Sequence, residues 1–229
     1  MMIQASLPAW FYRMSGWLLI VSALSMTAVQ YVHLEDVPTG LGQMDYFVDV
    51  AVWTHIALFV ANGLFMLGFI GLYVRQAEKL KWWGWLSFPM LFGFVFIDTL
   101  HAPLQIFDYP VFFKDITTEA QLQEAVDLVN EISYRVGPGM FLMAMLMPFI
   151  LIGTILMGSS MLKARIVPRW VSIVNLCTIP LILLPYGPVT KYVFPLQFLV
   201  FALYGGFLAF EKRRGAAPAI GPDASASVQ

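Results

Sequence analysis

Six long stretches with almost no charged side chains constrain the fold of this 229-residue chain. They cover residues 14–32, 50–74, 82–104, 137–162, 170–185 and 192–210. A bilayer core about 30 Å thick requires roughly 20 mostly apolar residues for each helix that crosses it. The sequence therefore predicts an all-α integral membrane protein built as a bundle of six transmembrane helices.

The composition excludes several other classes of protein. Hydrophobic residues make up 59% of the chain and charged residues only 12%, whereas ordinary soluble domains carry about 25% charged residues. This balance excludes a soluble domain, a disordered chain and a nucleic-acid-binding protein. The single cysteine, Cys177, excludes an internal disulfide and a paired-cysteine redox or metal site.

The positions of the basic residues predict how the bundle is oriented. Ten of the 13 lysines and arginines flank the stretches on one side: Arg13, Arg75, Lys79, Lys81, Lys163, Arg165, Arg169, Lys212, Arg213 and Arg214. Because basic residues are concentrated in cytoplasmic loops, we expect a multi-pass protein of the inner (plasma) membrane with both termini in the cytoplasm. Its expected partners are the lipid bilayer and either further copies of itself or a larger membrane complex.

Two long loops, 33–49 and 105–136, are expected on the opposite side of the membrane and carry ten acidic residues. Within the second loop, between spans three and four, residues 118–136 show apolar side chains at helical spacing. Thr118 and Gln121 have the spacing of a capping box at the start of this segment. We expect residues 118–136 to form an amphipathic helix that covers the outer mouth of the bundle. The six spans and this helix form one domain, residues 1–214, and residues 215–229 are expected to be a disordered tail.

One group of polar residues stands out within the apolar stretches. Asp98 and His101 are three residues apart on span three, so they share a helical face that Gln105 extends by one turn. His55 and Asn62 share a face of span two in the same way. A carboxylate in hydrocarbon requires a partner, and the expected partners of Asp98 are His55, His101 or Arg135.

These residues leave three interpretations open. In the first, Asp98 and a histidine form a structural hydrogen-bonded pair. In the second, His55, Asp98 and His101, with His33 as a further donor, bind a transition metal, or two of the histidines bind haem. In the third, His55, Asp98, His101, Asn62 and Gln105 form a proton relay or substrate site of a transporter or a membrane enzyme.

No recognised catalytic motif decides between these interpretations. The chain has no phosphate-binding loop, no zinc-protease motif and no nucleophile elbow. A protein of this size without a motif is also consistent with an accessory subunit of a larger membrane complex. Whether the chain is an enzyme, and which ligand it binds, is left open by the sequence.

Overall fold

The computed structural model describes residues 7–34, 36–134, 137–184 and 188–211, in which no β-strand occurs. The predicted tail 215–229 lies outside these residues. The helices are α1 (Ala9–Val32), α2 (Met44–Gln76), α3 (Trp82–Pro103), α4 (Tyr109–Phe112), α5 (Glu119–Tyr134), α6 (Pro138–Ala144), α7 (Leu146–Ala164), α8 (Arg169–Cys177), α9 (Ile179–Leu183), α10 (Pro188–Val193) and α11 (Leu199–Phe210). Short 3-10 helices cover Leu41–Gln43 (η1) and Phe194–Phe198 (η3), and a π-helix covers Leu104–Asp108 (η2).

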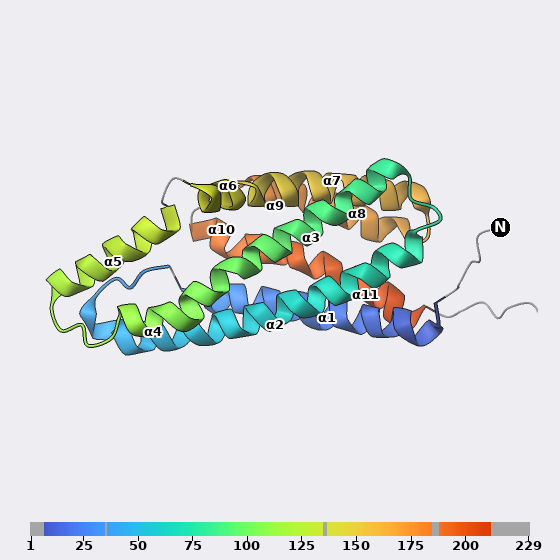
Figure 1. The fold of residues 1–229 in the computed structure, drawn as a ribbon. Helices are drawn as coiled ribbons and strands as arrows, with labels where there is room; N and C mark the ends of the chain where they lie inside the picture. Colours follow the sequence, from blue (N-terminus) through green and yellow to red (C-terminus); the bar gives the residue numbers. More distant parts are fainter. Residues whose placement is uncertain (1–6, 35, 135–136, 185–187, 212–229) are drawn as a thin grey trace, which may run out of the picture.

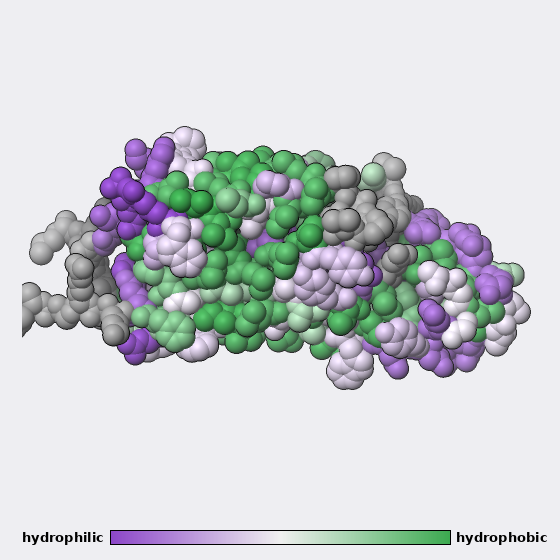
Figure 2. All heavy atoms as spheres, turned by 180° about the vertical axis from the view of Figure 1, so that it is seen from behind, coloured by the Kyte–Doolittle hydropathy of each residue, from purple (hydrophilic) through white to green (hydrophobic). Residues whose placement is uncertain are grey.

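Five helical segments are long and apolar enough to cross a membrane: Ala9–Val32, Leu41–Gln76, Trp82–Phe112, Gly139–Ala164 and Lys191–Phe210. The sixth expected stretch forms a shorter apolar segment, Arg169–Leu183. Figure 2 shows a broad apolar waist between two hydrophilic ends, as a protein embedded in a bilayer requires. The prediction of a helical membrane protein is therefore confirmed, while the structure alone supports five full-length spans.

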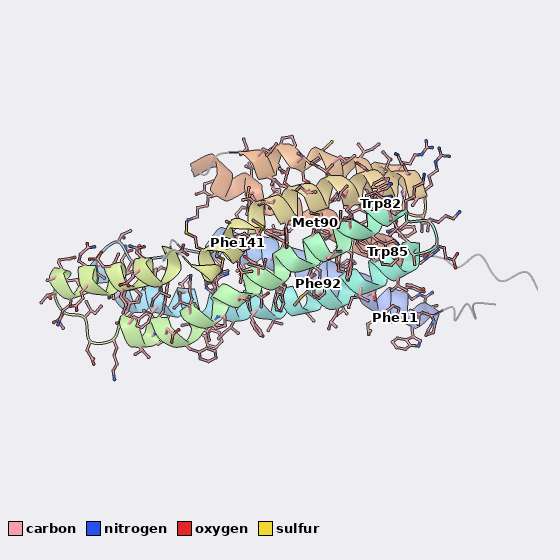
Figure 3. The ribbon with its side chains drawn as sticks, turned by 45° about the horizontal axis from the view of Figure 1, so that its top comes forward. Phe11, Trp82, Trp85, Met90, Phe92 and Phe141 are labelled. Atoms are coloured by element: carbon pink, nitrogen blue, oxygen red, sulfur yellow. The ribbon has the colours of Figure 1, made fainter. Side chains whose placement is uncertain are left out.

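Aromatic side chains mark one end of the apolar waist. Phe11, Trp82 and Trp85 lie at the end of the bundle where α1 begins (Figure 3). Trp82 is largely exposed there. Indole rings favour the depth of the lipid headgroups because they present both an apolar surface and a hydrogen-bond donor.

Helix α1 packs between α2 and α11 through small residues. A methyl group added to Gly68 of α2 would lie 2.8 Å from the Ser15 carbonyl oxygen of α1. Gly205 of α11 would meet the Gly16 carbonyl oxygen at 2.6 Å in the same way. Small residues let helix backbones approach closely in a membrane, where van der Waals contact drives association. This packing fixes where the far end of α1 lies relative to α2.

Three breaks interrupt the second half of the bundle close to proline residues. Thr178 separates α8 from α9 just before Pro180, and η3 contains Pro195. Met145 separates α6 from α7, three residues before Pro148. Proline cannot donate a backbone hydrogen bond and clashes with the preceding turn, which explains why helical geometry changes at each of these places.

The two expected loops are shorter than the sequence indicated. Helix α2 already begins at Met44, and α3 continues through η2 into α4 (Figure 1). Both extensions carry acidic residues, which made them resemble loops, but their apolar faces are covered. The helices therefore extend beyond the expected spans 50–74 and 82–104 into the segments that were expected as loops.

Helix α5 covers the extensions of α2 and α3 that project beyond the other spans. Its buried residues Leu122, Ala125 and Val129 form a second hydrophobic core with residues that include Phe47 and Tyr109. The Gln121 backbone N–H donates to Thr118 Oγ1, and the Thr118 backbone N–H donates to Gln121 Oε1, so the predicted capping box is confirmed. The helix was expected to cover the outer mouth of the bundle, whereas α5 packs beside the extensions of α2 and α3.

The close approach of α1 and α11 generates a stability prediction. A methyl group on Gly16 would overlap the backbone of Ala209, so Gly16→Ala should destabilise the bundle by about 1–3 kcal/mol. Gly63→Ala is the matched control, because a methyl group there meets no atom within 4 Å. Thermal unfolding in detergent should show a lower midpoint for Gly16→Ala only. Equal midpoints for the two variants would contradict the packing of α1 on α11.

Candidate functional site

All three histidines of the chain lie together at the outer end of the bundle, the end that carries α5. His33 directly follows the last residue of α1, His55 lies in α2 and His101 lies three residues before the start of η2. The His55–His33 and His55–His101 ring centroids are 4.9 Å and 5.1 Å apart. We call these three residues the histidine cluster.

His55 is the central member of the histidine cluster and is 1% exposed. Its Nδ1 lies 2.8 Å from the carbonyl oxygen of Ala51, one helical turn earlier. Because a carbonyl can only accept, Nδ1 carries the proton and Nε2 presents its lone pair. The fold of α2 therefore sets the tautomer of this imidazole.

The lone pair of His55 faces the two other imidazoles. His55 Nε2 lies 3.3 Å from His33 Nε2 and 3.2 Å from His101 Nε2. A single lone pair on a ring nitrogen cannot form two good hydrogen bonds, so one of its neighbours is poorly satisfied. The ring nitrogens of His33 and His101, both of metal-ligand type, thus lie within 3.3 Å of His55 Nε2.

A second polar layer lies deeper in the bundle. Asn62 Nδ2 donates to Asp98 Oδ2 at 3.1 Å and to Thr99 Oγ1 at 3.0 Å. Asn62 is fully buried, and within the part of the chain that the structure describes its Oδ1 has no hydrogen-bond partner. His101 Nδ1 is 3.9 Å from Asp98 Oδ1, which is too long for a hydrogen bond but close enough for electrostatic attraction.

A third polar layer lies on the outer side of the histidine cluster. Gln105 Nε2 donates to Asp36 Oδ1 at 3.3 Å, and Tyr109 donates its hydroxyl proton to the Asp36 carbonyl oxygen at 2.7 Å. Gln105 and Tyr109 are buried on η2 and α4. These bonds hold the chain that follows α1 against the extension of α3, and so they help to position His33.

The electrostatic environment favours a neutral imidazole at His33. Burial lowers the pKa of His33 below its ordinary value, and the Asp36 carboxylate opposes this shift in part. A neutral imidazole retains a lone pair, which is the form that binds metal ions.

Haem and a metal ion place different geometric requirements on the histidine cluster. Axial histidines bind haem from opposite faces of the porphyrin, but His55 contacts both neighbours directly at hydrogen-bond distance, so haem does not fit between them. Among the described residues, no three or more His, Cys, Asp and Glu side chains are already arranged to hold a metal ion. The cluster is instead an open chain with His55 in the middle.

The structure brings together the residues that the sequence singled out, with different partners. Asp98 lies 3.9 Å from His101, one of its expected partners, but its hydrogen bond comes from Asn62, which was not among them; Arg135, another expected partner, lies outside the described residues. Asp36, Thr99 and Tyr109 were not anticipated. Thr99 follows Asp98 directly, but Asp36 and Tyr109 become neighbours only through tertiary packing, for which the sequence contains no local pattern.

Comparisons with known proteins add no assignment to this geometry. The sequence matches no protein-family model, and comparison with curated proteins and with solved structures found no match. The function must therefore be inferred from the site itself.

The deeper polar layer predicts a stability effect at Asn62. Asn62→Leu has a similar size but leaves Asp98 and Thr99 without their common donor, which should cost about 1–3 kcal/mol. Asn130→Leu, at an exposed position of α5, is the matched control and should change stability by less than about 0.5 kcal/mol. Thermal unfolding of both variants measures the difference, and an unchanged midpoint for Asn62→Leu would show that these bonds contribute little.

Proposed function

We propose that this protein binds a divalent transition-metal ion, Zn²⁺ or Cu²⁺, through His33, His55 and His101. The observation that carries the proposal is the convergence of all three histidines of the chain from three separate elements, with the His55 lone pair facing the other two. Imidazole nitrogen is a preferred ligand of both ions. The bond from His55 Nδ1 to the Ala51 carbonyl is the outer-shell contact typical of metal-bound histidines.

The distances within the histidine cluster support this proposal. Two nitrogens bound tetrahedrally at 2.0–2.1 Å from zinc lie about 3.3–3.4 Å apart, and the two observed separations are 3.3 and 3.2 Å. Both pairs share His55, so rotation of an outer ring is required to close the open chain around one ion. Asp98 lies beside the ring of His101 and would act as its outer-shell carboxylate.

The surroundings of the cluster favour binding over passage through the membrane. The side chains of His101 and Asp98 are 28% and 22% exposed, so the cluster can be reached from outside the bundle. Towards the opposite end of α2, the buried residues after Asn62 include Phe65 and Phe69, which belong to the main apolar core. The hydrogen-bonded layers around the histidine cluster therefore reach no further along α2 than Asn62, and the next described side-chain hydrogen bond to another helix is that of Tyr73 with Ser87.

The same proposal includes a six-span orientation in the inner membrane with both termini cytoplasmic. The start of α1 and the end of α11 lie at the same end of the bundle (Figure 1), and Trp17 near that start contacts Phe210. If the two ends of the bundle's chain lie on one side of the membrane, the number of crossings is even. Arg169–Leu183 would then be a crossing in addition to the five long segments, and the fifth in chain order. Arg75 pairs with Glu211 at this end, and Lys163 lies 5.2 Å from the Trp83 ring.

A proton relay is the second candidate function. The observation that favours it is the open arrangement of the histidine cluster, which continues through His101 towards Asp98. A transporter using this relay would lose proton-coupled uptake into proteoliposomes when Asp98 is replaced by Asn. Unchanged metal affinity in the same variant would favour the relay, because the metal-binding proposal expects Asp98→Asn to bind metal more weakly.

Metal titration of purified protein tests the main proposal. We expect wild-type protein in detergent to bind one Zn²⁺ or Cu²⁺ per chain by calorimetry. Each of His33→Ala, His55→Ala and His101→Ala should weaken binding by at least about 100-fold, because even outer-shell changes cost 10–100-fold. Unchanged affinity in all three variants would overturn the proposal.

A pair of aspartate variants tests the outer-shell role of Asp98. Asp98→Asn removes the charge beside His101 and should weaken metal binding by roughly 10-fold. Asp115→Asn is the control, because Asp115 lies in an exposed turn whose positive φ asparagine also tolerates. Equal affinities for the two variants would mean that Asp98 takes no part in metal binding.

A reporter fused after Gln229 tests the orientation. Because basic residues flank the cytoplasmic ends of the spans, we expect a fused fluorescent protein that matures in the cytoplasm to be active and a fused periplasmic phosphatase to be inactive. The opposite pattern would reverse the proposed orientation and would place the histidine cluster on the cytoplasmic side.

A further inference from the structure

A small cavity lies in the centre of the bundle, separate from the histidine cluster. All of the long helical segments contribute to its wall, including Met26 of α1, Phe65 of α2 and Leu91 of α3. The space open to the centre of a water molecule is about 10 Å³, which is close to the smallest cavity that holds one water molecule. Most of the wall is apolar.

Four buried polar residues line this cavity: Thr154, Asn175, Thr178 and Gln197. Thr154 lies in α7 and Asn175 in α8. Thr178 is the residue that separates α8 from α9, and Gln197 lies in η3, so these two residues lie where the helices are interrupted. Asn175 Nδ2 donates to the Thr154 carbonyl oxygen at 3.0 Å, and Thr178 Oγ1 donates to the Asn175 carbonyl oxygen at 2.7 Å. The interrupted helices therefore place polar side chains at the centre of an apolar core.

Gln197 is the member of this group that lacks a partner. It is 3% exposed and lines the cavity, and its Nε2 has no hydrogen-bond partner among the described residues. A buried amide without a partner is costly, and almost all such groups in folded proteins bind another protein group or an ordered water. Thr178 Oγ1 uses its proton on Asn175, so its lone pairs are free to accept.

We propose that this central cavity binds one ordered water molecule, which accepts a hydrogen bond from Gln197 Nε2 and donates to Thr178 Oγ1. The cavity has the volume for one water and the two polar partners that such a site requires. The water would connect η3 to the break between α8 and α9. It is a site for a small hydrogen-bonding molecule, independent of the proposed metal site.

The position of this water relative to the histidine cluster gives it a functional meaning. Val95 and Phe65 line the cavity, and they lie one helical turn from Thr99 and Asn62, the deepest polar residues of the site. Phe94, which also lines the cavity, lies one turn from Asp98, so three apolar side chains belong both to the cavity wall and to the turns next to the site. The hydrated centre would thus reduce the apolar barrier between the outer polar layers and the bundle centre.

Nuclear magnetic resonance with ¹⁵N-glutamine labelling tests this site in full-length protein. We expect a cross-relaxation peak between the Gln197 side-chain amide and water in wild-type protein, assigned by its loss in Gln197→Met.

Thermal unfolding distinguishes a hydrated site from a dry one independently. If water satisfies Gln197, Gln197→Met should unfold at the same temperature or lower; if the amide is unpaired, the variant should unfold at a higher temperature. Gln123→Met, at an exposed position of α5, is the matched control. The absence of a water peak at Gln197 in wild-type protein would overturn the proposal, and this wild-type result does not depend on the folding of any variant.

Discussion

The close contact of α1 with α2 and α11 is the packing on which the outer site depends. Glycines on both partners let the backbones approach, so a methyl group at Gly68 or Gly205 would meet the backbone of α1. Tight backbone contact leaves little freedom for α1 to slide or tilt. Its last turn consequently delivers His33 to a defined place beside His55, and the geometry of the histidine cluster is set by packing near the other end of the same helix.

The helical membrane fold was predictable because its patterns are local. Apolar runs identified the spans, and the Thr118–Gln121 capping box identified the start of α5. The extension of α2 back to Met44 was not predictable, since Asp45 and Asp49 resemble loop residues until α5 covers the opposite face. The break at Thr178 leaves Arg169–Leu183 shorter than a standard span, although Pro180 marked its position.

The candidate site was predictable to the extent that helical spacing determines it. The three-residue separation of Asp98 and His101 and the seven-residue separation of His55 and Asn62 place each pair on one face. The spacing contains no information about which pairs meet across helices, so Asp98 proved to bond with Asn62. Asp36 and Tyr109 could not be anticipated, because their bond joins a connection to a helix 73 positions away.

The location of His33 has a consequence for how related chains could diverge. His55 and His101 are carried by packed helices, whose register cannot change without disturbing the core. His33 stands instead where α1 passes into the connection to η1, and connections tolerate insertions and deletions far better than helices do. An insertion directly after Val32, at the start of this connection, would move the third imidazole away from α1 while leaving the other two in place. Descendants of this protein could thus alter the number of donors, and with it the choice of ion, by altering one short connection.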